Sequence, residues 1–425
     1  MKSRERKNRF SHYVRINPAL CNGCVLCMKA CPTKAIRVRG EKAHIEGACI
    51  DCGECIRVCP RGAIKAVTTG YDASKMKSNA ILSVSPVFYA QFGDDVSPND
   101  VLSALKKAFK HVYDQAASVV ELFNLATEFY IQERRENQDE TWPLISSVCP
   151  VVTRLIAYRF PSLLKNIIPI VPPREIAARE LKRSLYGNPS FKSEEFGIYH
   201  VSPCSAKMIS IKESVLLEAS YLDGALGINE IYDVVKREFG KADKDVMPER
   251  FIGSGLGWGM SGGEIAGLES GRFLAVSGMQ ETIRYLEKIE MGLLSDIEYV
   301  EFRTCSEGCI GGPLTVTDKY QAKNTLQKFV KIFGVERRLD CAEVREAYEA
   351  GWFFIDKERV PLQDPSKGLS VDEALRRQEA VEKVYRLLPL KECGICGSPD
   401  CRTFAEDVVD GRAELSQCPL HSGGG

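Results

Sequence analysis

The sequence predicts an α/β protein with a small cysteine-rich module at each end. Two observations support this prediction. Apolar segments with the spacing of strands alternate with amphipathic helical segments from residue 81 to residue 333. Of the 17 cysteines, eight lie before this region and four lie near the C-terminus, in short runs. At 425 residues the chain is long enough for about three domains.

The N-terminal domain, residues 1–77, contains two copies of one cysteine pattern between Ile16 and Ile64. Each copy reads C-x2-C-x2-C-x3-C-P, the run of bacterial ferredoxins, in which the fourth cysteine crosses to the other 4Fe-4S cluster. Two zinc sites are the alternative, but these favour paired C-x2-C motifs with a wider separation. The resemblance implies one cluster on Cys21, Cys24, Cys27 and Cys59 and a second on Cys49, Cys52, Cys55 and Cys31.

The central domain, residues 78–336, is predicted to alternate strands and helices. Ile81–Gln91 opens it as an apolar strand, and the SPND motif at Ser97–Asp100 signals the start of a helix. Further strands are expected at 117–123, 196–202, 272–278 and 298–304, and further helices at 280–291 and 324–333.

Four cysteines lie in loops of this central domain. The expected strand Ile198–Val201 comes directly before Cys204, and the strand Tyr299–Arg303 comes directly before Cys305. Open α/β sheets place their ligands at the carboxyl ends of strands. We therefore expect a third metal site, built from Cys149, Cys204, Cys305 and Cys309.

Residues 337–388 lack strand alternation and predict a helical linker. Its last part continues into the stretch 372–390, which has the apolar spacing of a helix. We expect this helix to pack on its own domain, with a partner interface or a homodimer as the alternative. Cys341 also lies in a helical pattern and is interpreted as a partly buried structural thiol.

The C-terminal domain, residues 389–420, carries a different cysteine spacing, C-x2-C-x4-C-x16-C. It resembles the small 4Fe-4S motif of corrinoid iron-sulfur proteins and of a subunit of an electron-bifurcation-linked membrane complex. Gly394 and Gly397 let the backbone approach a cluster closely, and a short helix is expected to start near Arg402. A zinc knuckle is the alternative. The expected ligands are Cys393, Cys396, Cys401 and Cys418, and residues 421–425 form a tail.

Charge and hydropathy exclude several classes of function. Lys plus Arg and Asp plus Glu both total 57, so no net charge favours nucleic acid or an anionic membrane. The basic N-terminus is not followed by a long apolar stretch, and no run of 18 apolar residues occurs. We therefore expect a cytoplasmic protein, and in a reducing compartment clustered thiols favour metal ligation over disulfides.

The ferredoxin-type runs, followed by the motifs PCSAK and TCSEGCIGGP, resemble the iron-iron (FeFe) hydrogenases from Ile16 to about Val335. That family has a two-lobed α/β domain with an H-cluster between the lobes. The H-cluster is a 4Fe-4S cube joined through a cysteine to a two-iron subsite that carries CO, cyanide and an azadithiolate. The resemblance implies that Cys309 is the bridging thiolate and that Lys207 donates to a cyanide, whereas a solvated surface lysine is the alternative. By the same resemblance, the other H-cluster ligands are Cys149, Cys204 and Cys305.

Several positions depart from the efficient members of that family. Val148 stands where they have a proton-relaying cysteine, and Ser210 stands where they have a glutamate on the same relay. Ser202 and Arg303 replace methionines that pack against the two-iron subsite. Because positioned acid-base groups contribute about 100-fold to 10,000-fold, we expect slow turnover.

The glycine-rich segment Gly253–Gly267 lacks a GK[ST] ending, which disfavours a phosphate loop. It resembles instead the segment that wraps the two-iron pocket in FeFe hydrogenases. Within it, Glu264 is expected to be an exposed loop carboxylate, with a role as substitute proton carrier as the alternative. His200 is expected to be a strand histidine satisfied by backbone, with a relay role as the alternative.

Taken together, the sequence predicts a slow, sensory or regulatory FeFe hydrogenase that interconverts dihydrogen with protons and electrons. Its cofactors would be an H-cluster and three further 4Fe-4S clusters. Its partners would be dihydrogen, protons, and ferredoxin or another electron carrier, together with a signalling partner, and would include neither nucleic acid nor membrane. The alternatives are a non-catalytic iron-sulfur carrier or assembly factor without the two-iron subsite, and a component of a larger electron-transfer complex.

Overall fold

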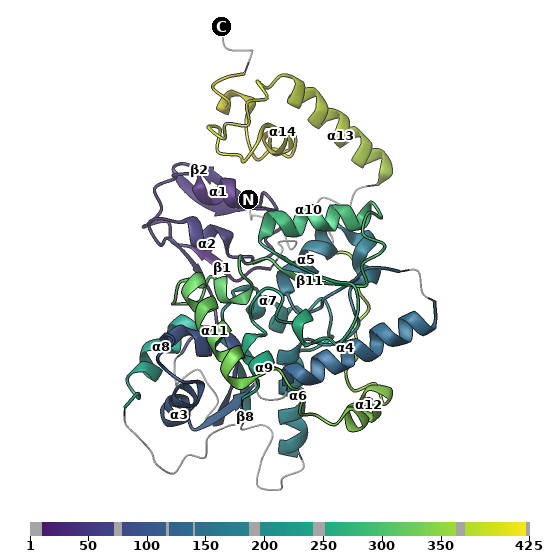
Figure 1. The fold of residues 1–425 in the computed structure, drawn as a ribbon. Coiled ribbons are helices and arrows are strands. Elements are labelled where there is room, and N and C mark those ends of the chain that lie inside the picture. Colours follow the sequence, from purple (N-terminus) through teal and green to yellow (C-terminus); the bar gives the residue numbers. More distant parts are fainter. Residues whose placement is uncertain are drawn as a thin grey trace. The chain divides into compact units, whose positions relative to one another are not determined.

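The computed structural model describes residues 11–71, 79–115, 119–138, 141–186, 196–240, 251–362 and 370–421. The chain divides into two compact units (Figure 1). The first unit joins Met1–Ala66 to Leu362–Gly425, and the second is Val67–Pro361. The two terminal cysteine-rich modules, which lie far apart in the sequence, therefore belong to one unit.

The N-terminal part of the first unit is built from two short antiparallel strand pairs and two short helices. A residue with left-handed backbone precedes each helix, Val25 with a φ of 60° and Gly53 with a φ of 78°. Both residues lie inside the cysteine runs, where the chain turns before it enters the helix. The elements are β1 (Val14–Ile16) paired with β4 (Ile64–Ala66), β2 (Ile36–Arg39) paired with β3 (Lys42–Ile45), α1 (Leu26–Ala30) and α2 (Glu54–Val58).

The C-terminal part of this unit consists of helix α13 (Val371–Arg386), helix α14 (Cys401–Val409) and the 3-10 turn η6 (Leu415–Gln417). Both helices confirm the elements expected from the sequence. Val381 of α13 and Phe404 of α14 are buried in one apolar cluster, so α13 packs on its own module.

The second unit contains two parallel sheets, which confirms the predicted α/β class. In the first sheet, β5 is central, and its residue Ile81 pairs with His111 of β6 and Ile198 of β8. The sheet orders are β6-β5-β8-β9 and β10-β11-β7. The strands are β5 (Asn79–Val84), β6 (His111–Asp114), β7 (Leu144–Ile145), β8 (Phe196–Ser202), β9 (Gly224–Gly227), β10 (Phe273–Ser277) and β11 (Tyr299–Arg303).

Helices lie between these strands along the chain, as in other α/β domains. Ser97 and Asp100 form the expected capping box at the start of α3. The helices described in this unit are α3 (Pro98–Ala108), α4 (Val119–Glu136), α5 (Pro150–Arg159), α6 (Pro173–Tyr186), α7 (Ala206–Lys212), α8 (Ile228–Lys236), α9 (Gly253–Gly257), α10 (Met279–Glu290), α11 (Lys319–Phe333) and α12 (Cys341–Glu349), with 3-10 turns η1 (Pro86–Phe92), η2 (Pro161–Asn166), η4 (Ile265–Gly267) and η5 (Cys309–Gly311).

Two predicted strands and one predicted burial are wrong. The strand expected at Ile81–Gln91 ends at Val84, because Pro86 has no N–H for the sheet and begins η1 instead. The strand expected at 117–123 is helical from Val119 onward in α4, and residues 117–118 lie outside the described part. Cys341 is exposed at the start of α12.

Among the described residues, no helix combines the length and the apolar character needed to cross a membrane.

Candidate iron-sulfur sites

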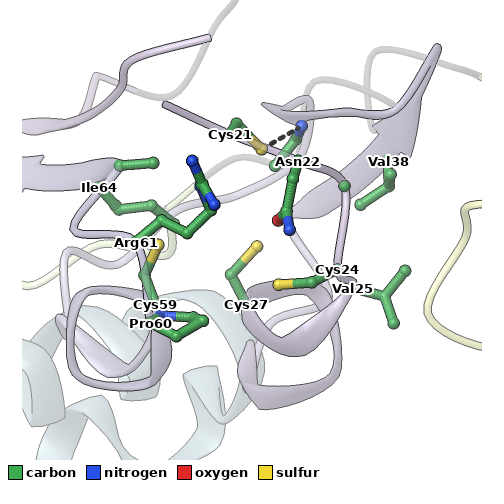
Figure 2. Close-up of a pocket in the computed structure, with 13 residues that line it drawn as sticks. Cys21, Asn22, Cys24, Val25, Cys27, Val38, Cys59, Pro60, Arg61 and Ile64 are labelled. Carbon is green, nitrogen blue, oxygen red and sulfur yellow. Dashed lines mark hydrogen bonds between the residues drawn. The ribbon is translucent and has the colours of Figure 1, made fainter. Parts of the chain in front are cut away.

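Four cysteines of the N-terminal module line one pocket. Three come from the first cysteine run and the fourth, Cys59, comes from the second. Figure 2 shows the sulfur atoms of Cys24, Cys27 and Cys59 extending toward a common space. The cysteines lining the pocket are Cys21, Cys24, Cys27 and Cys59.

The remaining cysteine of the first run, Cys31, lies with the second run. Burial raises the pKa of Cys55 to about 12, and the nearby Cys31 adds to the rise. Cys31 likewise acts on the pKa values of Cys49 and Cys52. The structure therefore brings together the two crossed sets of four cysteines. Because raised pKa values leave these thiols protonated, bound iron would have to displace their protons.

The C-terminal cysteines converge around α14. Cys401 begins this helix and Cys418 follows η6, and both are buried. Burial raises the pKa of Cys396, with smaller contributions to the rise from Cys418 and Cys393. Cys393 itself is exposed, so one edge of this group of cysteines faces solvent.

In the second unit, the four remaining expected ligands lie in loops that leave both sheets. Cys149 precedes α5, and its sulfur lies 3.7 Å from Oγ1 of Thr304, the residue before Cys305. Burial raises the pKa of Cys204 to about 11, and Cys149 and Cys309 add to the rise. Cys149, Cys204 and Cys309 thus lie within electrostatic range of one another, and Cys305 follows Thr304, which contacts Cys149, although the four cysteines span 160 residues of sequence.

The glycine-rich segment packs against the last of these loops, as the resemblance implied. The N–H of Cys309 donates to the carbonyl of Gly259 at 2.8 Å, and the N–H of Ser261 donates to that of Glu307 at 3.0 Å. Gly308 has a φ of 91°, and a Cβ there would lie 2.5 Å from the nitrogen of Ser261. Only glycine therefore permits this close approach beside Cys309.

Lys207 lies in the first turn of α7 and is only 8% exposed. The alternative of a solvated surface lysine is therefore wrong. Burial lowers the pKa of Lys207, and the electrostatic effect of Cys309 and Cys204 opposes that shift. The ammonium group therefore depends on anionic charge at the cysteine site.

Arg174 is a site residue that sequence reasoning missed. It lies in the first turn of α6, is buried, and donates to the carbonyl of Val148 at 3.1 Å and to Oγ of Ser210 at 3.3 Å. It thus contacts both positions at which the expected proton relay is interrupted. The only sequence signal is a charged pair after two prolines, PPRE, and this pattern does not reveal burial.

Glu264 is fully buried, so its prediction as an exposed carboxylate is wrong. It accepts hydrogen bonds from the hydroxyl of Tyr299 at 2.5 Å and from Arg303 at 2.6 Å. Neighbouring Glu301 accepts three backbone N–H groups of the glycine-rich segment. Burial raises the pKa of Glu301 to about 7, which Arg303 opposes and Glu264 reinforces. Strand β11 thus supplies Arg303, which pairs with Glu264, and Glu301, which accepts the backbone N–H groups of the glycine-rich segment.

Two other expected pocket residues are engaged by neighbours. Nδ1 of His200 lies 3.2 Å from Nε2 of Gln115, whereas its Nε2 has no hydrogen-bond partner among the described residues. Burial lowers the pKa of His200 well below its usual value, which favours the neutral ring. Ser202 accepts from the N–H of Cys204 and donates to its carbonyl, so its hydroxyl shapes the cysteine loop.

The residues of this site fit a bound anionic group. Three buried cations, Arg174, Lys207 and Arg303, lie within electrostatic range of the cysteines. Among the described residues, neither Nε of Arg174 nor Nη1 of Arg303 has a hydrogen-bond partner. Buried donors without partners are costly, and an iron-sulfur group with thiolate and cyanide ligands would offset that cost.

Three segments of the chain match known protein families. Residues 13–60 match the 4Fe-4S dicluster domain, and residues 78–266 match the C-terminal domain of the iron-only hydrogenase large subunit. Residues 388–420 match a family described as a putative Fe-S cluster.

Individual relatives agree with these matches. The chain is 27% identical over 297 residues to the periplasmic [Fe] hydrogenase large subunit of Nitratidesulfovibrio vulgaris, covering 63% of this chain and 69% of that one. It is also 47% identical over 38 residues to one subunit of the ion-translocating oxidoreductase complex of Thiobacillus denitrificans, a match that covers 9% of this chain. The chain spans only 20% of the length of that second relative.

A solved structure shares the fold. A variant of the FeFe-hydrogenase HydA1 from Chlamydomonas reinhardtii aligns with a TM-score of 0.52 at 13% identity. The alignment covers 68% of this chain and 96% of that one. At this identity the likeness shows a common architecture.

Because the ion pair of Glu264 with Arg303 is buried, we expect two glutamate variants to differ in their free energy of unfolding. Glu264→Gln should lower the free energy of unfolding by about 3 kcal/mol, because Arg303 would stay buried without its full counter-charge. The control Glu269→Gln should cost less than about 1 kcal/mol, because Glu269 is 72% exposed in its ion pair with Arg337. Urea unfolding followed by tryptophan fluorescence measures both, and equal effects would contradict the inferred burial.

Proposed function

We propose that this chain is a slow, sensory or regulatory FeFe hydrogenase. It joins a 4Fe-4S dicluster domain, the C-terminal domain of an iron-only hydrogenase large subunit, and a further iron-sulfur motif near its own C-terminus. It interconverts dihydrogen with protons and electrons. The main support is the burial of Lys207 beside Cys204 and Cys309, since a buried ammonium needs an anionic partner.

Each part of the site has a separate task in this proposal. Cys149, Cys204, Cys305 and Cys309 would hold the H-cluster, and Cys309 would supply the thiolate that the resemblance assigns to both of its parts. When bound, the two-iron subsite supplies the metal atoms at which dihydrogen is formed or split. Lys207 holds that subsite by donating a charge-assisted hydrogen bond to a cyanide.

Slow turnover follows from the side chains around Val148. Valine neither donates nor accepts a proton, and the neighbouring guanidinium of Arg174 stays protonated at all physiological pH values. Ser210 donates to the carbonyl of Lys207 and accepts from Arg174, so its hydroxyl is engaged on both sides. Val148, Arg174 and Ser210 therefore do not form a proton relay of the expected cysteine and glutamate type.

Electrons reach the site through the two ferredoxin-type clusters, and ferredoxin or another small electron carrier is the proposed partner. Dihydrogen and protons are the substrates, and the output of a sensory enzyme passes to a signalling partner. Clustered cysteines that ligate iron favour a reducing compartment such as the cytoplasm.

A non-catalytic iron-sulfur carrier or assembly factor is the second candidate. The interrupted proton relay favours it, as does Arg303, a charged residue in place of an apolar packing residue. Lys207 distinguishes the two candidates, because a carrier with only a 4Fe-4S cube at this site has no cyanide to receive its hydrogen bond.

Infrared spectroscopy after loading with a synthetic two-iron complex tests the proposal. We expect CO and cyanide bands that respond to hydrogen in the unmodified protein. Cys309→Ala should abolish the bands, whereas Cys393→Ala should remove the iron of one cluster and leave the bands intact. Absence of bands from unmodified protein with full iron content would support the carrier, and loss of bands in Cys393→Ala would refute the division into separate sites.

Retention of the two-iron subsite should depend on Lys207. In Lys207→Asn the cyanide loses its charged donor, so we expect at least a tenfold weaker retention of the infrared bands after gel filtration. Lys212→Asn, at the exposed end of the same helix, is the control and should retain the bands. Equal retention in both variants would place Lys207 outside the cyanide site.

Restoring the relay should accelerate turnover only when both positions are changed. Val148→Cys alone should give a small increase, because Ser210 leaves the next position without a carboxylate. Val148→Cys with Ser210→Glu should exceed the sum of the single gains, since a relay works only when its groups are contiguous. Hydrogen production assays with infrared control of H-cluster content measure this, and additive or absent gains would place the limiting step in electron transfer or another proton route.

A further inference from the structure

The C-terminal module contacts the N-terminal module through a buried carboxylate. Asp407 of α14 is fully buried and receives two hydrogen bonds from Arg37 of β2, from Nε at 2.5 Å and from Nη2 at 3.1 Å. The side chain of Arg37 is only 4% exposed. This bidentate pair joins residues 370 positions apart in the sequence.

Arg39 adds a second link to the loop of the C-terminal cysteines. Its guanidinium donates to the carbonyl of Cys396 at 2.5 Å, to Oγ of Ser398 at 3.0 Å and to Asp407 at 3.1 Å. Ser398 also donates to Asp407 at 2.8 Å, and Arg412 lies 3.3 Å away. The carboxylate of Asp407 therefore pairs with arginines from both the N-terminal and the C-terminal module.

A backbone hydrogen bond joins two residues that lie beside the two cysteine sites. The N–H of Val38 donates to the carbonyl of Gly397 at 2.8 Å. Gly397 follows Cys396, and the side chain of Val38 lines the pocket of Cys21, Cys24, Cys27 and Cys59. A Cβ at Gly397 would lie 1.8 Å from the carbonyl oxygen of Val38, so the contact requires glycine.

The chemistry of the contact indicates permanent docking. A buried carboxylate and a buried guanidinium each lose much of their hydration, and only a close, hydrogen-bonded geometry compensates for that loss. If the two modules separated repeatedly, Asp407 and Arg37 would have to be rehydrated each time. Outside this buried pair, Lys29 donates to the carbonyls of Glu392 and Pro399, and Lys34 pairs with Asp400.

We propose that this docking is an electron-transfer junction, in which the C-terminal cluster site exchanges single electrons with the site of Cys21, Cys24, Cys27 and Cys59 through the Gly397–Val38 contact. One iron-sulfur group is oxidised by one electron and the other is reduced by one, with no bond made or broken. A one-electron carrier of the ferredoxin class supplies or removes the electron at the exposed Cys393 edge. The inference rests on the iron-sulfur part of the proposed function and is independent of hydrogen chemistry.

Electron paramagnetic resonance of the reduced, full-length holoprotein tests the junction. We expect magnetic coupling between the C-terminal cluster and the first ferredoxin-type cluster. Arg39→Leu, whose lost hydrogen bonds all reach the C-terminal module, should remove the coupling while the iron content stays unchanged. Asp407→Asn is the second variant and should do the same. Arg377→Leu, which breaks an ion pair with Asp410 inside the C-terminal module, is the control and should keep the coupling.

Hydrogen exchange at the Val38 amide provides a readout of docking that needs no spectroscopic signal from iron. We expect exchange at least tenfold faster in Arg39→Leu than in the unmodified protein, and unchanged exchange in Arg377→Leu. Unchanged exchange in both Arg39→Leu and Asp407→Asn would overturn the docking. Faster exchange without any magnetic coupling in the unmodified protein would overturn the junction. Neither measurement needs the two-iron subsite, so both can be made on protein that shows no CO or cyanide bands. Failure of the hydrogenase proposal is therefore distinguished from failure of the junction.

Discussion

The site of the second unit depends on the burial of positive charge beside four cysteines. Arg174, Lys207 and Arg303 are all removed from water at the point where the loops of two sheets meet. Buried cations need anionic partners, and the carboxylates of Glu264 and Glu301 serve Arg303. Lys207 has the cysteines as its opposite charges. The charge balance of Lys207 therefore depends on the cysteine site.

Two parallel sheets make this arrangement possible. The carboxyl ends of β8 and β11 point their following loops into the same region, so cysteines far apart in sequence become neighbours. The N–H of Leu314 donates to the carbonyl of Pro203, which ties the loop after β11 to the loop after β8. Close packing of backbone at Gly308 against the glycine-rich segment then fixes the position of Cys309.

The first unit uses buried charge for a different purpose. Asp407 has no role as a cysteine-site ligand, yet it collects guanidinium groups from both ends of the chain. The result is that two cysteine-rich modules, separated in sequence by the whole second unit, share one contact surface. The same physical rule, that buried ions need opposite charges beside them, thus applies to one candidate cofactor site and one module interface.

The sequence by itself determined the class of the fold and the grouping of most cysteines into runs. These features are local: cysteine spacing, the strands before Cys204 and Cys305, and the capping box at Ser97 all depend on a few consecutive residues. A local pattern was also the source of the errors at 81–91 and 117–123, because a short apolar run suits a strand and a buried helix equally well.

Only the tertiary structure decided which charges are buried and what they meet. Glu264 and Arg303 are 39 residues apart, and Arg37 and Asp407 are 370 apart. Neither pair leaves a periodic signal in the sequence, so Glu264 is predicted to be exposed. Arg174 is not recognised for the same reason, because its partners Val148 and Ser210 lie 26 and 36 residues away. An ionisable side chain becomes buried when its partner arrives from a distant segment, and that meeting is a property of the folded chain.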